Sequence, residues 1–161
     1  MSPSTEAIVR AATPHDLEFL VRGNAQMALE TESLALDEDR LREGIRALLH
    51  DPARGFYLIA ELDSKQAGQM LITFEWSDWR NGVFWWIQSV YTTPDSRRWG
   101  VFRNLYWHAE LLAKQQGDVC GLRLYVEAHN HRAQAIYRKC GMSETPYRML
   151  EVDYVISRTG D

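Results

Sequence analysis

The spacing of the apolar residues changes twice along this chain, and each change marks a different kind of secondary structure. Up to residue 50, most apolar side chains recur with the helical period of 3.6 residues. From Phe56 to Thr92 they form short runs that are typical of strands, and the helical period returns after Pro94. This order predicts a mixed α/β fold.

Turn signals divide the middle of the chain into three strands. One of these turns ends in Asn81-Gly82, a dipeptide that favours a β-hairpin, so the three strands are expected to form an antiparallel meander. A strand–helix–strand unit follows, whose two strands are expected to be parallel neighbours. The predicted elements are a strand at 7–11, a helix beginning at Thr13-Pro14, a helix capped by Asp37, strands at 56–60, 68–76 and 83–92, a helix at 101–117, a strand at 122–128, a helix at 131–140 and a strand at 147–155.

The length and composition fit one globular domain. The chain has 161 residues, of which 45% are hydrophobic and 25% charged, so we expect a single domain over 1–161 with its core at about 7–155. No apolar run is long enough for a transmembrane helix, and the first residues lack the pattern of a secretory signal. Cys120 and Cys140 are therefore expected to be reduced thiols in a cytoplasmic protein. The net charge of −4 argues against a nucleic-acid partner.

A basic turn, Arg97-Arg98-Trp99-Gly100, comes immediately before an amphipathic helix. The first turn of a helix offers unpaired backbone N–H groups and a partial positive charge, which together suit a phosphate. Gly100 lets the backbone approach a ligand closely, and Arg97, Arg98 and Arg103 would add charge-assisted hydrogen bonds. Solvated surface turns share this pattern, so taken alone it leaves both interpretations open.

A second motif places Asn130, Ala133 and Tyr137 on one face of a short helix that ends at Gly141-Met142. An Asn at the end of a strand can hold a ligand that is rich in amides, and a Tyr on the same face can donate a proton. The alternative is a core tyrosine on an amphipathic helix.

Taken together and in this order, the two motifs resemble the pattern of the GNAT superfamily of N-acetyltransferases. The residues that fall on the family pattern are Arg97, Gly100, Asn130, Ala133, Tyr137, Gly141 and Met142. The resemblance implies an α/β (α+β) fold with a mixed, mainly antiparallel central sheet, one parallel strand pair and helices on both faces. It also implies acetyl-CoA as the co-substrate.

The resemblance further implies a role for each matching position. The backbone of Val90, Tyr91 and Thr92 would hold the pantetheine arm, and an amide near Tyr91 would polarise the thioester carbonyl. Tyr137 would protonate the departing thiolate, and Asn130 would contact the pantetheine. The remaining cofactor-binding residues would be Arg97, Arg98, Trp99, Gly100, Val101, Phe102, Arg103 and Ala133.

Two positions depart from the family pattern. Phe102 replaces the third small residue of the turn, although it keeps the backbone N–H that a phosphate needs. Gln88 stands on the strand where many relatives carry a glutamate base, and it could orient a water molecule or the amine instead. The alternative bases, acting directly or through water, are Glu75, Glu127, His129, Glu30 and Glu32.

The expected acceptor is a primary amine of a small molecule. The stretch from Glu75 to Gly82 is slightly similar to the corresponding region of diamine and thialysine acetyltransferases. Glu75 and Trp79 would bind a cationic amine there, and Glu30 and Glu32 would line the acceptor pocket. The aromatic residues could instead pack within the sheet or form the surface of a homodimer.

The expected function is acetyl transfer from acetyl-CoA by direct attack of the amine in a ternary complex. No metal, membrane or nucleic acid is expected to take part. Two other classes stay open at this point. One is a non-catalytic acyl-CoA-binding or regulatory module with the same fold, and the other is an oligomeric scaffold.

Overall fold

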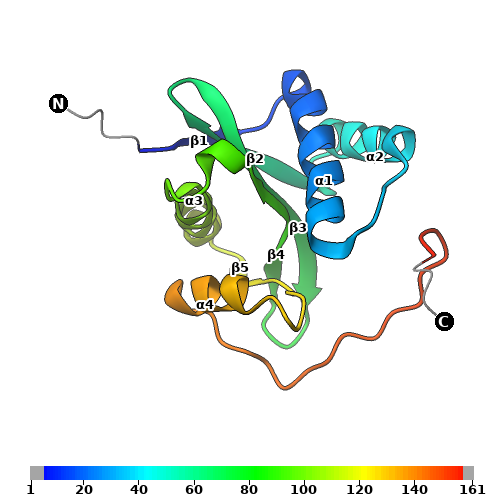
Figure 1. Ribbon diagram of the computed structural model, residues 1–161. Coiled ribbons are helices and arrows are strands. Elements are labelled where there is room, and N and C mark those ends of the chain that lie inside the picture. Colours follow the sequence, from blue (N-terminus) through cyan, green and yellow to red (C-terminus); the bar gives the residue numbers. More distant parts are fainter. Residues whose placement is uncertain (1–5, 158–161) are drawn as a thin grey trace. The chain divides into compact units, whose positions relative to one another are not determined.

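A computed structural model describes residues 6–157 (Figure 1). The chain divides into two compact units, Met1–Tyr125 and Val126–Asp161, and each is described by itself. The first unit contains two single-turn 3-10 helices, η1 (Pro14–Asp16) and η2 (Pro94–Ser96). Its other elements are β1 (Ile8–Ala11), α1 (Leu17–Glu32), α2 (Glu38–His50), β2 (Gly55–Leu62), β3 (Lys65–Ser77), β4 (Gly82–Thr92), α3 (Val101–Gln116) and β5 (Val119–Arg123).

The five strands form one sheet in the order β1-β2-β3-β4-β5. Neighbouring strands are antiparallel except for β4 and β5, which are parallel and joined through α3. The register pairs Leu58 with Met70 and Thr73 with Trp86. The predicted meander and the predicted parallel pair are both confirmed.

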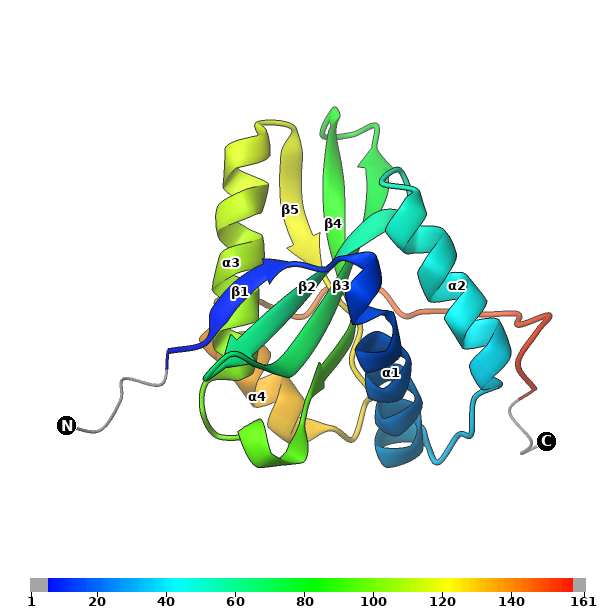
Figure 2. The ribbon, with the colours of Figure 1, turned by 90° about the horizontal axis from the view of Figure 1, so that it is seen from above.

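Helices cover both faces of this sheet, as Figure 2 shows for the first unit. Leu20 of α1 and Ile45 of α2 pack with Tyr57 and Ile59 of β2 in a buried apolar cluster. On the other face Gly68 of β3 leaves room for the side chain of Val101, the first residue of α3. The close approach at Gly68 places the start of α3 against the sheet.

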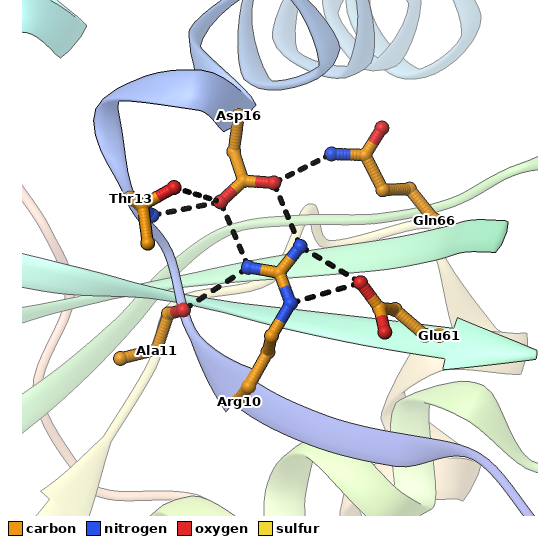
Figure 3. Close-up of polar contacts among 6 residues, drawn as sticks. All are labelled: Arg10, Ala11, Thr13, Asp16, Glu61 and Gln66. Carbon is orange, nitrogen blue, oxygen red and sulfur yellow. Dashed lines mark hydrogen bonds and ion pairs between the residues drawn. The ribbon is translucent and has the colours of Figure 1, made fainter. Parts of the chain in front are cut away.

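A buried carboxylate ties β1 to the elements around it (Figure 3). Asp16, 2% exposed, accepts hydrogen bonds from both terminal nitrogens of Arg10, at 2.8 and 2.9 Å. It also accepts from the Thr13 backbone N–H at 2.7 Å and from Gln66 Nε2 at 2.6 Å. Arg10 in turn pairs with Glu61 of β2 at 2.8 Å. These contacts fasten η1, β1, β2 and β3 at one corner of the sheet.

A β-bulge interrupts the pairing of β4 with β3. Gln69 pairs with Tyr91 and Leu71 pairs with Gln88, so β4 has one residue more than β3 between these two pairs. Ser89 lies in this extra stretch with a φ of 48°, in the left-handed region.

β5 is shorter than expected and begins earlier. We predicted a strand at 122–128, but the parallel ladder runs from Val83–Val119 to Trp86–Arg123 and stops there. The bulge of β4 comes three residues after Trp86, and a bulge bends its strand away from a neighbour. The residues after Arg123 therefore have no continuous ladder to join.

The second unit contains α4 (His131–Lys139), close to the predicted helix at 131–140. Gly141, with a φ of 88°, ends it as predicted. The N–H of Gly141 bonds the Arg138 carbonyl and the N–H of Met142 bonds the Tyr137 carbonyl, which is a Schellman motif.

The predicted strand at 147–155 is wrong. The apolar residues there suggested a strand, but a strand also needs a neighbouring backbone to pair with. The Asp153 carboxylate instead accepts hydrogen bonds from the backbone N–H groups of Val155 and Ile156, both at 2.8 Å. This local turn competes with an extended strand in the segment.

Candidate functional site

The start of α3 presents free backbone donors. Gly100 is the N-cap residue with a φ of 72°, and no side chain caps the helix. Asn104 is the first residue whose N–H bonds inside the helix, to the Gly100 carbonyl at 3.0 Å. The N–H groups of Val101 and Arg103 are therefore available to an anion, and the helix dipole favours one. A phosphate fits the chemistry of this turn.

The three arginines of the turn differ in their partners. Arg97 Nη2 forms an ion pair with Glu30 Oε2 at 2.6 Å, and Arg97 Nε donates to the Thr92 carbonyl at 3.2 Å. The guanidinium of Arg103 stacks on Trp107, 4.9 Å from the ring centroid. Arg98 is exposed and has a φ of 77°. Phe102, the departure from the family pattern, packs its ring 6.1 Å from that of Tyr106.

The Arg97–Glu30 ion pair also includes Tyr91, so it links α1 to the end of β4. The Arg97 guanidinium carbon lies 5.7 Å from the centroid of the Tyr91 ring, and the side chain of Tyr91 lies near Glu30. Burial and the nearby Glu30 charge raise the pKa of Tyr91. Burial would raise the pKa of Glu30, but hydrogen bonds from Gln26 and Arg97 outweigh it and lower that pKa. Glu30 is thus a paired carboxylate.

Of the other predicted acceptor residues, Glu32 lies on the same helix as Glu30, whereas Glu75 and Trp79 lie outside that helix. Glu75 of β3 forms an ion pair with Arg123 of β5 at 2.6 Å. Trp79 lies in the β3–β4 turn and is 83% exposed. Glu32 ends α1. Two of the acids predicted to bind the acceptor, Glu30 and Glu75, therefore have arginine partners.

Gln88 of β4 is held by a neighbouring strand. Its Nε2 donates to Thr73 Oγ1 of β3 at 2.7 Å, which fixes the plane of the amide. The predicted pantetheine-binding residues Val90, Tyr91 and Thr92 follow directly after the bulge and complete β4.

The second unit holds the remaining predicted residues. Asn130 caps α4, where its Oδ1 accepts from the Ala133 N–H at 3.1 Å. Tyr137 lies two turns further along α4, and burial raises the pKa of its hydroxyl, which keeps it protonated. Glu127 and His129, named as alternative bases, form a local turn in which the His129 N–H donates to Glu127 Oε2 at 2.8 Å.

Sequence reasoning missed two features of the first unit. Arg123 lies 3.6 Å from the centroid of the Phe84 ring and reaches Glu75 across β4. The left-handed backbone of Ser89 is the other. No local signal could have indicated either, because a serine does not mark a positive φ and the Arg123–Glu75 pair joins residues far apart in sequence.

The described part of the chain contains no group of three or more His, Cys, Asp and Glu side chains that could hold a metal ion. Among residues 6–157, every helix is too short or too polar to span a lipid bilayer.

Comparisons with known proteins agree with this geometry. The model of the acetyltransferase (GNAT) family matches residues 23–142. No curated protein matches the chain. A possible acetyltransferase from Clostridium difficile 630 is 39% identical, with a TM-score of 0.86, over 93% of this chain and 99% of that one.

Two further solved structures share the fold. A predicted acetyltransferase from Clostridium acetobutylicum, with acetyl-CoA, has a TM-score of 0.74 at 20% identity, over 92% of this chain and 96% of that one. An aminoglycoside N-acetyltransferase in complex with CoA has a TM-score of 0.75 at 12% identity, over 96% of this chain and 99% of that one. The family match and the relative at 39% identity carry the assignment: the chain belongs to the GNAT family of acetyltransferases.

Proposed function

We propose that the protein transfers an acetyl group from acetyl-CoA to a primary amine of a small molecule, by direct attack of the amine in a ternary complex. The observation that best supports acetyl-CoA as the co-substrate is the start of α3, where no side chain caps the helix. Its donors, the left-handed Gly100 and the exposed Arg98 form a turn whose chemistry fits a pyrophosphate.

The same turn assigns a role to each arginine. Arg98 and Arg103 would add charge-assisted hydrogen bonds to the phosphates. Arg97 would position the turn, since it is bonded to Thr92 and Glu30. The N–H groups of Val101, Phe102 and Arg103 would supply the main-chain donors.

In the first unit, the proposed reacting groups are Gln88 and the backbone near Tyr91, both in β4; in the second unit, the proposed group is Tyr137 of α4. Acetyl-CoA supplies an activated acyl group as a thioester. A backbone amide near Tyr91 would stabilise the negative charge that develops on the thioester oxygen. Gln88, with its amide plane fixed by Thr73, would orient the amine or a water molecule. Tyr137 would protonate the departing thiolate, in keeping with its raised pKa.

The acceptor would be a small molecule rather than a highly charged polyamine. Glu30 and Glu75 already neutralise Arg97 and Arg123, so neither supplies a free negative charge for a second cation. Glu32 and Trp79 stay candidates for contact with the acceptor. Cytoplasmic location and a homodimer are further parts of the proposal.

Calorimetric titration with acetyl-CoA tests the cofactor half. We expect micromolar binding that weakens about tenfold or more in the Arg98→Ala/Arg103→Ala variant, because two phosphate contacts are lost. Arg40→Ala/Arg46→Ala in α2 is the matched control, since it removes the same charge from exposed positions away from the turn. An absence of binding by the native protein at millimolar acetyl-CoA would refute the proposal.

Turnover of Tyr137→Phe tests the catalytic half, with a panel of small amines and detection of released thiol. Removal of the hydroxyl should lower kcat by about a hundredfold while the affinity for CoA is retained, because general-acid catalysis is worth that order of magnitude. Unchanged turnover would assign the proton to another donor. Binding of acetyl-CoA without turnover of any amine would favour a non-catalytic binding module.

A further inference from the structure

A chain of buried polar groups lies beneath the bulge of β4. Asn24 of α1 is 5% exposed, and its Nδ2 donates to the Leu20 carbonyl at 2.9 Å and to the Tyr57 hydroxyl at 3.3 Å. Tyr57 of β2 is 4% exposed; burial raises the pKa of its hydroxyl, and the nearby side chains of Asn24 and Ser89 offset part of this rise. The chain therefore runs from α1 through β2 to the left-handed residue of β4.

Gln69 reaches the same residue from β3. It is fully buried, and its Nε2 lies 3.5 Å from the Ser89 carbonyl oxygen. Its Oε1 has no hydrogen-bond partner among residues 6–157. A buried amide oxygen without a partner lowers the stability of the fold. An apolar side chain would fill the same space without this cost, so packing alone does not explain a glutamine here.

Gly23 of α1 makes room for this amide. A Cβ atom at position 23 would overlap Oε1 and crowd the rest of the Gln69 amide. The close approach of α1 to β3 at Gly23 therefore restricts the Gln69 side chain, whose Nε2 lies against the Ser89 carbonyl. Two elements, α1 and β3, together aim the amide at the bulge.

The conformation of Ser89 needs such support. A left-handed φ is unfavourable for a residue with a Cβ, by about 1 kcal/mol, and such residues persist where the surroundings hold them. Here Gln69 Nε2 contacts the carbonyl of Ser89, and the hydroxyl of Tyr57 lies near the Ser89 side chain. Val90 and Tyr91, which follow Ser89, carry the backbone groups proposed to meet the acetyl thioester.

We propose that Gln69 and Tyr57 are positioning residues, which hold the Ser89 bulge so that the amide near Tyr91 is aimed at the thioester carbonyl. This inference rests on the proposed function. Gln69 and Tyr57 would not touch acetyl-CoA themselves. They would act through the backbone of β4, and Asn24 would orient Tyr57 for this purpose.

The hydrogen bond from the amide near Tyr91 to the thioester carbonyl can be measured directly. Its readout is the infrared carbonyl stretch of acetyl-CoA labelled with ¹³C in the acetyl carbonyl. A hydrogen bond from a backbone amide polarises the carbonyl and lowers its stretching frequency relative to free acetyl-CoA. The measurement needs no acceptor, because it uses the binary complex of the full-length protein with acetyl-CoA. The affinity for CoA, which lacks the acetyl group, is measured beside it.

We expect Gln69→Leu and Tyr57→Phe each to lose most of the frequency shift, while the Kd for CoA changes by less than about threefold. Tyr57→Phe removes a single oxygen atom, so it keeps the test available if Gln69→Leu does not fold. Ile72→Val, a buried change in β3 at a position that pairs with Ile87, is the control and should keep the full shift.

A double variant separates positioning from core packing. Glycine adopts a positive φ without strain, so Ser89→Gly should restore part of the shift in the Gln69→Leu background. A purely structural role for Gln69 predicts no such restoration, and the two effects would then add. That result would overturn the inference, as would a full shift in both single variants.

The wild-type protein distinguishes the two levels of the proposal. Binding of acetyl-CoA without a frequency shift would overturn the inference and leave the proposed function standing. A failure to bind acetyl-CoA would overturn the proposed function and the inference with it.

Discussion

At the scale of single residues, the Asp16 carboxylate is a buried charge held by hydrogen bonds from Arg10, Thr13 and Gln66. Burial raises its pKa, but hydrogen bonds from Arg10, Thr13 and Gln66 outweigh burial and lower the pKa from 3.8 to about 2. Because the folded pKa lies below the unfolded one, this carboxylate stabilises the fold above about pH 4. The contribution is lost as the pH falls toward about 2.

We expect Asp16→Asn to lower the free energy of unfolding at pH 7 by about 2 kcal/mol, the value of a pKa difference of this size. The variant should also lose part of the pH dependence of stability between about pH 4 and pH 2. Urea unfolding over this pH range measures both effects. Asp39→Asn, whose side chain is 99% exposed, is the control and should change little. An equal loss in both variants would contradict the role given to Asp16.

Local chemistry made some residues predictable. Asp37 caps α2 by accepting from the backbone N–H groups of Asp39 and Arg40, and Gly141 ends α4, as the sequence indicated. These signals act within four residues of chain. The partner of Arg97 could not be found in this way, because Glu30 lies 67 residues away and only the packing of α1 brings it near.

At the scale of elements, the contact between β3 and α3 sets the position of the proposed phosphate turn. A methyl group at position 68 would lie 2.5 Å from Val101 Cγ1 and 3.1 Å from the Tyr91 carbonyl oxygen. At Tyr91 the backbone of β4 pairs with Gln69 of β3, which holds it in place. The added methyl group would therefore displace Val101 and the start of α3. The first turn of α3 is the part whose N–H groups are proposed to bind the phosphates.

Gly68→Ala is therefore expected to weaken acetyl-CoA binding several-fold and to lower the free energy of unfolding by about 2 kcal/mol, the usual cost of overpacking. Calorimetry and urea unfolding measure the two effects. Gly44→Ala in α2 is the matched control, because a Cβ there meets nothing within 4 Å. It should raise the stability by about 0.5–1 kcal/mol and leave binding unchanged. Native affinity in Gly68→Ala would show that the turn does not depend on this contact.

The type of most helices and strands was predictable from the spacing of apolar residues, and most of their boundaries lie close to the predicted ones. β3 is longer than predicted, Lys65–Ser77 against 68–76, because its pairing with β2 and β4 extends to both turns. The end of the strand predicted at 122–128, and the whole strand predicted at 147–155, were wrong for a different reason. Strand formation depends on a partner strand, and the spacing of apolar residues contains no information about where that partner's ladder ends.

At the scale of the whole molecule, the hydrogen bonds of the chain differ greatly in their protection. β2, β3 and β4 lie inside the sheet with neighbours on both sides, and most of the buried side chains of the strands belong to them. Residues 141–157 contain no helix or strand, and the bonds from Val155 and Ile156 to Asp153 are local. The two parts should therefore open with very different free energies.

Amide hydrogen exchange followed by mass spectrometry is expected to show this order. Peptides from the centre of β2, β3 and β4 should exchange last, near the rate of global unfolding, and peptides from 143–157 should exchange first. Slow exchange in 143–157 would mean that this segment is paired in solution, for example in the proposed homodimer.

The fit of Gly23 against Gln69 has a consequence for how this sequence can change over evolutionary time. A side chain at position 23 collides with the amide unless residue 69 has first become smaller. A side chain at position 23 is thus expected to be tolerated only after residue 69 has become smaller, whereas a smaller residue 69 needs no earlier change at position 23. Changes at the two positions, which belong to different elements, are expected in that order.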